Sequence, residues 1–184
     1  RRLVNDDGSD TEGSPAYANF TLRLFRDAAA VMKTCNVSAD FIEARANRME
    51  AFVARTIRPN WMWDSIGDST AERLSTALVS PTSPLLWAAS RGRQGIAPSD
   101  LYSAFPNGGY IFGRSAWAPT ATYYSVRAVP AGARSSHSHL DSTAFTMMSQ
   151  GVQWIGDPGP YRYDTSALRK FITQRAAHSG LQIL

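Results

Sequence analysis

Two stretches near the start of the chain carry apolar residues at the three- and four-residue spacing of amphipathic helices. The first runs from Tyr17 to Met32 and follows Pro15, which suits the first turn of a helix. The second follows Ser38, which we expect to be its N-cap, and ends before Pro59. Further helices are expected at residues 69–78, 85–90 and around 101.

After Phe105 the pattern changes to short runs of aromatic and β-branched residues that are separated by Gly, Pro and Ser. Runs of this kind predict antiparallel strands. The strands are expected at residues 109–115, 122–129, 143–148 and 152–155, with a further strand beginning at 177. The sequence therefore predicts an α+β chain with two parts, helical over 1–104 and β-sheet over 105–184.

The composition is that of an ordinary folded protein, with 43% apolar, 11% aromatic and 18% charged residues and one cysteine. These values exclude a disordered tail, a collagen-like repeat, a coiled coil and a disulfide scaffold. No apolar run approaches the roughly 20 residues that a membrane-spanning helix needs. The chain starts with Arg1 and stops within a β-like run, so we expect a piece of a longer protein, whose export signal cannot be read here.

The net charge of +4 comes from scattered arginines, 17 of them beside only two lysines. Nucleic-acid binding usually requires a clustered basic face, so the charge pattern argues against such a partner. Arginines and aromatic rings suit an acidic sugar, because guanidinium groups pair with carboxylate or sulfate. Cys35 has no partner in the chain, which excludes an internal disulfide and a cysteine-rich metal site.

The densest group of polar side chains lies at residues 135–141 and contains His137, His139 and Asp141. In an extended segment the two histidines point to the same side, about 7 Å apart. A His-x-His pair is a common half of a zinc site, although loop histidines without any ligand are the alternative. Asp157, before Pro-Gly, is ordinarily a turn residue, and His178 is the third histidine.

The segment HSHLDS at 137–142 is similar to the HxHxDH signature of metallo-β-lactamase-fold hydrolases. Ser142 stands where that signature has its last histidine, and the long helical part upstream does not match that fold. A zinc-dependent hydrolase therefore stays a minor alternative.

A second resemblance extends over nearly the whole chain. The matching pieces, in order, are DG at 7–8, EGSPAY at 12–17, IGDS at 66–69, FPNGGY at 105–110, RS at 114–115, SHSHLD at 136–141, DPGPY at 157–161 and AAH at 176–178. In this order and spacing they resemble the heparinase II/III family of polysaccharide lyases. The resemblance implies the end of a helical (α/α) toroid over 1–104, followed by the first strands of an antiparallel β-sandwich over 105–184.

The resemblance also implies β-elimination on a polysaccharide that contains uronic acid. The reaction removes the C5 proton of the uronate and expels the O4-linked sugar, so it needs a base near C5 and an acid near the leaving oxygen. Tyr17 and His137 match the catalytic positions of the family. Arg134 is our candidate for contacting the acid group of the substrate, and the uronate-neutralising residue of the family would lie upstream of Arg1.

His139, Asp157 and His178 match the metal ligands of the family. The implied metal is divalent, usually zinc, and its role is structural, because it ties the strands together so that His137 faces the toroid. The implied partner is an acidic polysaccharide, and export to the periplasm or the medium is expected from substrates of that kind. A non-catalytic carbohydrate-binding relative is the main alternative, and the sequence leaves the particular polysaccharide and the oligomeric state open.

Overall fold

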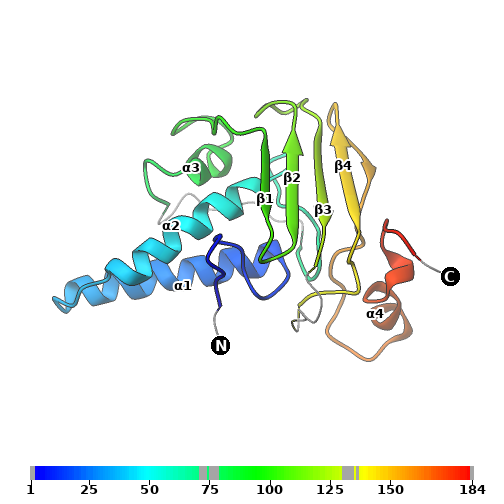
Figure 1. The fold of residues 1–184 in the computed structure, drawn as a ribbon, viewed down its shortest axis with the longest axis horizontal. Coiled ribbons are helices and arrows are strands. Elements are labelled where there is room, and N and C mark those ends of the chain that lie inside the picture. Colours follow the sequence, from blue (N-terminus) through cyan, green and yellow to red (C-terminus); the bar gives the residue numbers. More distant parts are fainter. Residues whose placement is uncertain (1–2, 71–73, 75–78, 130–134, 136, 183–184) are drawn as a thin grey trace.

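The computed structural model describes residues 3–70, 74, 79–129, 135 and 137–182. Within them, a pair of long helices extends from one end of an antiparallel sheet, and smaller helices flank the sheet (Figure 1). This order of helices followed by sheet confirms the predicted fold class. Most of the helix expected at 69–78, namely 71–73 and 75–78, lies outside the described residues.

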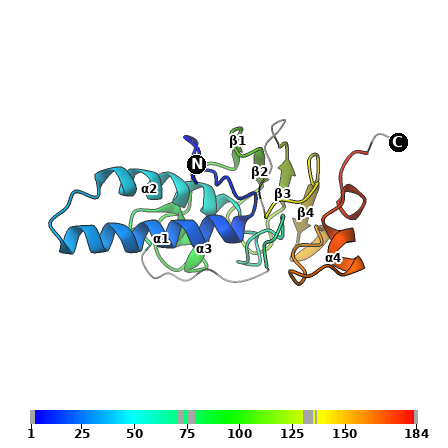
Figure 2. The same ribbon diagram turned by 90° about the horizontal axis from the view of Figure 1, so that it is seen from below.

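The two long helices form an antiparallel hairpin (Figure 2). Helix α1 covers Pro15–Thr34 and begins with proline in its first turn, as predicted. Helix α2 covers Asp40–Arg55, and its N-cap is Ala39 rather than Ser38, so that detail was wrong. The Ser38 hydroxyl still accepts a hydrogen bond of 3.4 Å from the amide of Asp40, the first residue of α2.

The described strands form one five-stranded antiparallel sheet in the order of the sequence. They are β1 Tyr102–Phe105, β2 Tyr110–Arg114, β3 Tyr123–Arg127, β4 Phe145–Ser149 and β5 Val152–Ile155. Strand β1 lies where a helix was expected around residue 101, because Tyr102–Phe105 pairs residue by residue with β2 across a short turn. That pairing is a long-range contact that overrides the local pattern.

Three short helices complete the described chain: α3 Pro84–Ala89, α4 Ala167–Ile172 and a 3-10 helix at Arg175–Ala177. The strand expected from residue 177 onward is wrong for residues 177–182, because Ala177 ends the 3-10 helix and residues 178–182 follow as bends and irregular chain. The Ser166 hydroxyl accepts a hydrogen bond from the Arg169 amide and so caps α4. None of the helices in the described ranges is long and apolar enough to cross a bilayer.

The helical part and the sheet share one hydrophobic core. The ring of Phe52, on α2, packs edge-on against Phe105 and Tyr110 with centroid distances of 5.0 Å each. Phe112 and Tyr123 extend the same cluster along β2 and β3. The shared core fixes α2, and the α1 helix paired with it, against the sheet, so residues of α1 and of the sheet loops can form a common site.

Candidate functional site

Tyr17 and His137 lie in direct contact, although they are far apart in the sequence. Their rings are stacked, with centroids 3.4 Å apart and planes 14° from parallel. Tyr17 belongs to the first turn of α1, and His137 lies in the connection between β3 and β4. The resemblance pointed to these two residues, and the fold brings them together.

The first turn of α1 is anchored to the loop at residues 66–69. The hydroxyl groups of Ser14 and Ser69 share a hydrogen bond of 2.7 Å, and the Ala16 amide donates to Ser69 at 3.1 Å. All of these atoms are buried or partly buried. The turn that carries Tyr17 is therefore held by a defined contact instead of by the helix alone.

The same loop also holds the backbone at His137. The Asp68 amide donates a 3.0 Å hydrogen bond to the carbonyl oxygen of His137. Gly67 has φ +56°, and a Cβ there would lie 2.6 Å from the oxygen of Gly13 and 2.7 Å from that of His137. Three chain segments thus meet at a point that has no room for a side chain.

The Asp68 carboxylate is the centre of the polar contacts at the site. It is buried, and Arg169 donates to both of its oxygens at 2.6 and 3.0 Å. His139 Nε2 lies 3.0 Å from Oδ1, and His137 Nδ1 lies 3.5 Å from Oδ2. Burial by itself would raise the pKa of Asp68, but the hydrogen bonds from His139 and Arg169 outweigh it and hold the pKa well below its usual range.

Two further side chains approach the stacked pair. The hydroxyl of Tyr163 lies 3.0 Å from the hydroxyl of Tyr17 and 3.4 Å from His137 Nδ1. On the other side, Glu12 Oε2 lies 3.8 Å from His137 Nε2. Sequence reasoning missed both residues, although Glu12 belongs to the matched EGSPAY segment and Tyr163 follows the matched DPGPY segment by two positions.

A pocket of about 680 Å³ opens beside Tyr17. Its lining is mainly aromatic and apolar, with one arginine and one carboxylate, and consists of Ala16, Tyr17, Phe20, Asp68, Thr70, Pro160, Tyr161, Arg162 and Tyr163. The apolar face of a sugar ring packs on such aromatic side chains. The pocket is therefore large enough and of the right chemistry for a sugar unit next to the stacked pair.

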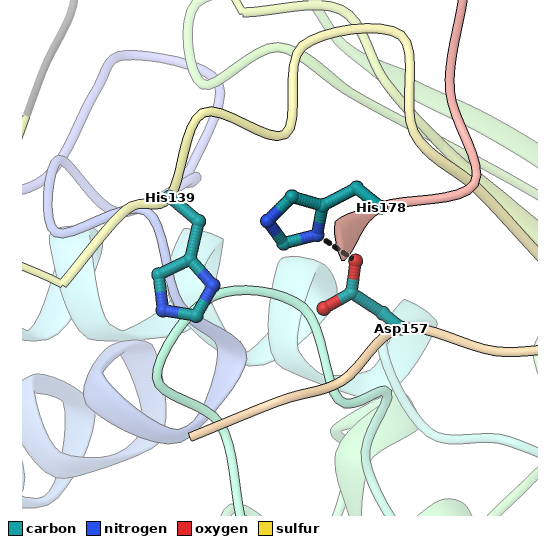
Figure 3. A group of neighbouring side chains, drawn as sticks. All are labelled: His139, Asp157 and His178. Atoms are coloured by element: carbon teal, nitrogen blue, oxygen red, sulfur yellow. Dashed lines mark hydrogen bonds and ion pairs between the residues drawn. The ribbon is translucent and has the colours of Figure 1, made fainter. Parts of the chain in front are cut away.

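His139, Asp157 and His178 form a second group of neighbouring side chains (Figure 3). One potential ligand atom from each residue lies within 4.8 Å of the other two. His178 Nδ1 lies 2.7 Å from Asp157 Oδ2. The three side chains come from the β3–β4 connection, the segment after β5 and the end of the 3-10 helix, so their grouping depends on the fold.

Two nitrogens in this group are available to a metal. His139 Nδ1 and His178 Nε2 are buried and have no hydrogen-bond partner among the described residues. The second nitrogen of each ring faces a carboxylate, Asp68 for His139 and Asp157 for His178. Asp68 is not one of the three candidate ligands, and a carboxylate in its place fixes the tautomer and orientation of a metal-binding imidazole such as His139. Two imidazoles and a carboxylate are a donor set that zinc accepts.

A buried charge cluster supports the segment before α1. Asp10 Oδ2 accepts hydrogen bonds from the amides of Glu12 and Ser14 at 3.1 and 3.4 Å. Burial raises the pKa of Asp10 to about 7, against the lowering effect of the Ser14 hydrogen bond and of the Arg127 charge. Arg127 also lies 3.5 Å from Asp141, so one buried guanidinium faces both the N-terminal segment and the histidine segment.

The described candidate residues lie in two groups. Tyr17 and His137 meet, and His139, Asp157 and His178 form one group. Arg134 lies outside the described residues. Asp68, Arg169 and Tyr163 connect the two groups and were not predicted. Asp68 lies in the matched IGDS segment and Tyr163 lies two positions after the matched DPGPY segment, but nothing in either segment assigned a role to them.

Comparison with protein families gives a match for the sheet part of the chain. Residues 97–183 match the family described as "Heparinase II/III-like, C-terminal". A curated relative, a heparin-sulfate lyase from Pedobacter heparinus, is 27% identical over 199 aligned residues. That alignment covers 100% of this chain and 30% of the relative, so the chain spans less than a third of its length.

Solved structures show the same fold. The heparan sulfate lyase HepC from Pedobacter heparinus matches with a TM-score of 0.83 and 23% identity, over 96% of this chain and 30% of that one. A heparinase III matches with a TM-score of 0.80 and 20% identity, over 96% of this chain and 32% of that one. Both likenesses include the helical hairpin as well as the sheet, because they cover almost all of this chain.

Proposed function

This chain carries the heparinase II/III-like C-terminal domain over residues 97–183, and on that premise we propose that its protein is a polysaccharide lyase. The proposed reaction is β-elimination at a uronic acid. The observation that carries the proposal is the stacked pair of Tyr17 and His137 at the rim of the aromatic pocket. A phenol and an imidazole in contact provide the two proton-transfer groups that an elimination needs.

In the proposed reaction one group of the pair takes the proton from C5 of the uronate. The electrons of the broken C–H bond form the C4–C5 double bond, and the C4–O4 bond breaks. The other group donates a proton to the leaving O4. The matched family positions assign this chemistry to Tyr17 as base and His137 as acid. Tyr17 lines the pocket, so a sugar bound there has its ring beside the phenol oxygen.

We further propose that His139, Asp157 and His178 hold a structural zinc ion. The two buried unpartnered nitrogens support this assignment, because a buried polar atom without a partner is costly unless something binds it. When bound, the ion would supply a fixed link between the β3–β4 connection and the segments after β5. His137, two residues from His139, would thereby be held toward Tyr17.

The proposed substrate is an acidic polysaccharide of the glycosaminoglycan type, as the names of the relatives suggest. Polymers of that size are met outside the cytoplasm, so we propose a periplasmic or secreted protein. Arg162 in the pocket lining can pair with a carboxylate or sulfate of such a chain.

The test is an ultraviolet assay of the full-length protein on a panel of uronate polysaccharides that includes heparan sulfate and heparin. Elimination creates a conjugated double bond that absorbs, so we expect an absorbance increase on at least one polymer. Binding without any product would show a non-catalytic carbohydrate-binding protein. New reducing ends without the absorbance would show hydrolysis, and either result would contradict the proposal.

A further inference from the structure

We propose that Tyr163 is a positioning residue for the reaction, whose hydroxyl group holds the phenol oxygen of Tyr17 and favours its deprotonated form. The inference rests on the proposed function, because it concerns the base of that reaction. Tyr163 lies in the segment after β5. It would join Tyr17 of α1 and His137 of the β3–β4 connection as a third residue of the site.

The geometry places one hydroxyl between the two proton-transfer groups. Tyr163 Oη lies 3.0 Å from Tyr17 Oη and 3.4 Å from His137 Nδ1. The Tyr163 ring is edge-on to the His137 ring, with centroids 6.2 Å apart. The three polar groups therefore form a chain in which an imidazole N–H can donate to Tyr163 while Tyr163 donates to Tyr17.

The Tyr163 ring is fixed from a second side. The guanidinium of Arg169 lies 5.0 Å from its ring centroid, and Arg169 is in turn held by both oxygens of Asp68. Partial desolvation, followed by the hydrogen bond with Tyr17 and the charge of Asp68, raises the pKa of Tyr163 well above its usual value. Tyr163 therefore stays protonated at neutral pH and is available as a hydrogen-bond donor.

A donor beside a phenol oxygen stabilises the phenolate more than the neutral phenol, because a hydrogen bond to a charged acceptor is stronger. The charged and titratable groups around the two tyrosines are Asp68, Arg169, His137 and Glu12, Arg162 and Tyr161 in the shared pocket lining, and Asp164 near Arg169. The negative charges of the Asp68 and Glu12 carboxylates disfavour a negative charge on the phenol oxygen of Tyr17. A neutral donor that contacts the Tyr17 oxygen directly offsets their effect.

The experiment is Tyr163→Phe in the full-length protein, with the absorbance assay run over a range of pH. Phe keeps the ring and its contact with Arg169 but removes the donor. We expect kcat/KM at neutral pH to fall ~10-fold, and the acidic limb of the pH profile to move up by about one pH unit, so that part of the lost rate returns at alkaline pH. Melting temperature and KM should change little, because Tyr163 is 62% exposed.

The matched control is Tyr102→Phe on edge strand β1, which should leave rate and pH profile unchanged. A Tyr163→Phe variant with the wild-type profile would overturn the inference. So would an equal loss of rate at every pH, since that marks a merely structural role. If the wild-type protein forms no double bond on any polymer, the proposed function fails, and this inference fails with it.

Discussion

Tyr17 differs from phenylalanine by one oxygen atom, which is the atom assigned to proton transfer. We expect Tyr17→Phe in the full-length protein to lower the rate of double-bond formation by ~10²–10⁴-fold. The ring stack on His137 is kept, so the melting temperature should stay within a degree or two of wild type. Unchanged turnover in the absorbance assay would show that Tyr17 is not the base.

His137 and His139 are two residues apart and provide a matched pair of variants. We expect His139→Ala to reduce bound zinc, measured by elemental analysis, and to lower the melting temperature, because it removes a buried candidate ligand. His137→Ala should retain the metal and the melting temperature while abolishing elimination. The zinc assignment is wrong if His139→Ala protein keeps both its metal content and its thermal stability.

The family resemblance of short segments, more than any pattern in the residues alone, pointed to the candidate residues. His137, His139, Asp157 and His178 stand in short recognisable segments, and Tyr17 follows a Ser-Pro helix start. Asp68, Tyr163 and Arg169 act through contacts with residues far along the chain, and no local pattern distinguishes them from surface residues. Their role depends on the fold, so sequence patterns alone could not assign it.

The short helix α4 is tied to the site through the ion pair of Arg169 and Asp68. Asp68→Asn removes the negative charge, so the largely buried guanidinium of Arg169 loses the carboxylate that it contacts directly. We expect a loss of about 3 kcal/mol in stability, seen as a lower melting temperature, with faster amide exchange in α4. Wild-type exchange in α4 would show that this ion pair does not hold the helix.

A surface ion pair provides the control for that variant. Lys33 and Glu43 pair at 2.6 Å between the two long helices, with side chains 60% and 31% exposed. Exposed pairs of this kind contribute little to stability, typically under about 1 kcal/mol. Glu43→Gln should therefore change the melting temperature far less than Asp68→Asn.

Element prediction succeeded where the pattern is long or clearly alternating. The two long helices and strands β2 to β5 were expected within a few residues of their observed positions. Strand β1 and helix α4 were not expected, although they have the same lengths as β5 and α3, which were expected, so length alone does not explain the difference. Strand β1 forms by pairing with β2, and α4 starts at a Ser166 cap, so both depend on single contacts and not on a repeated pattern.

The stability of the whole molecule should depend on pH through Asp10. Its pKa is raised from 3.8 to about 7 in the folded state, chiefly by burial, so folding takes up protons between those values. The contribution of Asp10 to the free energy of unfolding is therefore fully present below about pH 4, and it is lost as the pH rises through about 7. The loss in stability is of the order of 4 kcal/mol when the pKa of Asp10 in the unfolded chain has its ordinary value of 3.8.

The variant Asp10→Asn tests this dependence, because asparagine resembles the protonated acid and keeps an oxygen for the Glu12 and Ser14 amides. We expect its melting temperature to exceed that of wild type increasingly from pH 4 to pH 7, and the difference to be constant above. A constant difference in melting temperature between the variant and wild type from pH 4 to pH 7 would contradict a raised pKa at Asp10.

The meeting of Gly13, Gly67 and His137 also affects the order of events during folding. Helices α1 and α2 contact each other along a local hairpin and can form early, whereas this three-way junction requires two long loops to close. Closing a long loop costs chain entropy before the contacts that stabilise the closed loop can form, so the junction forms late and slowly. A refolding chain therefore acquires its helix content first, and the stacked tyrosine and histidine are assembled near the end.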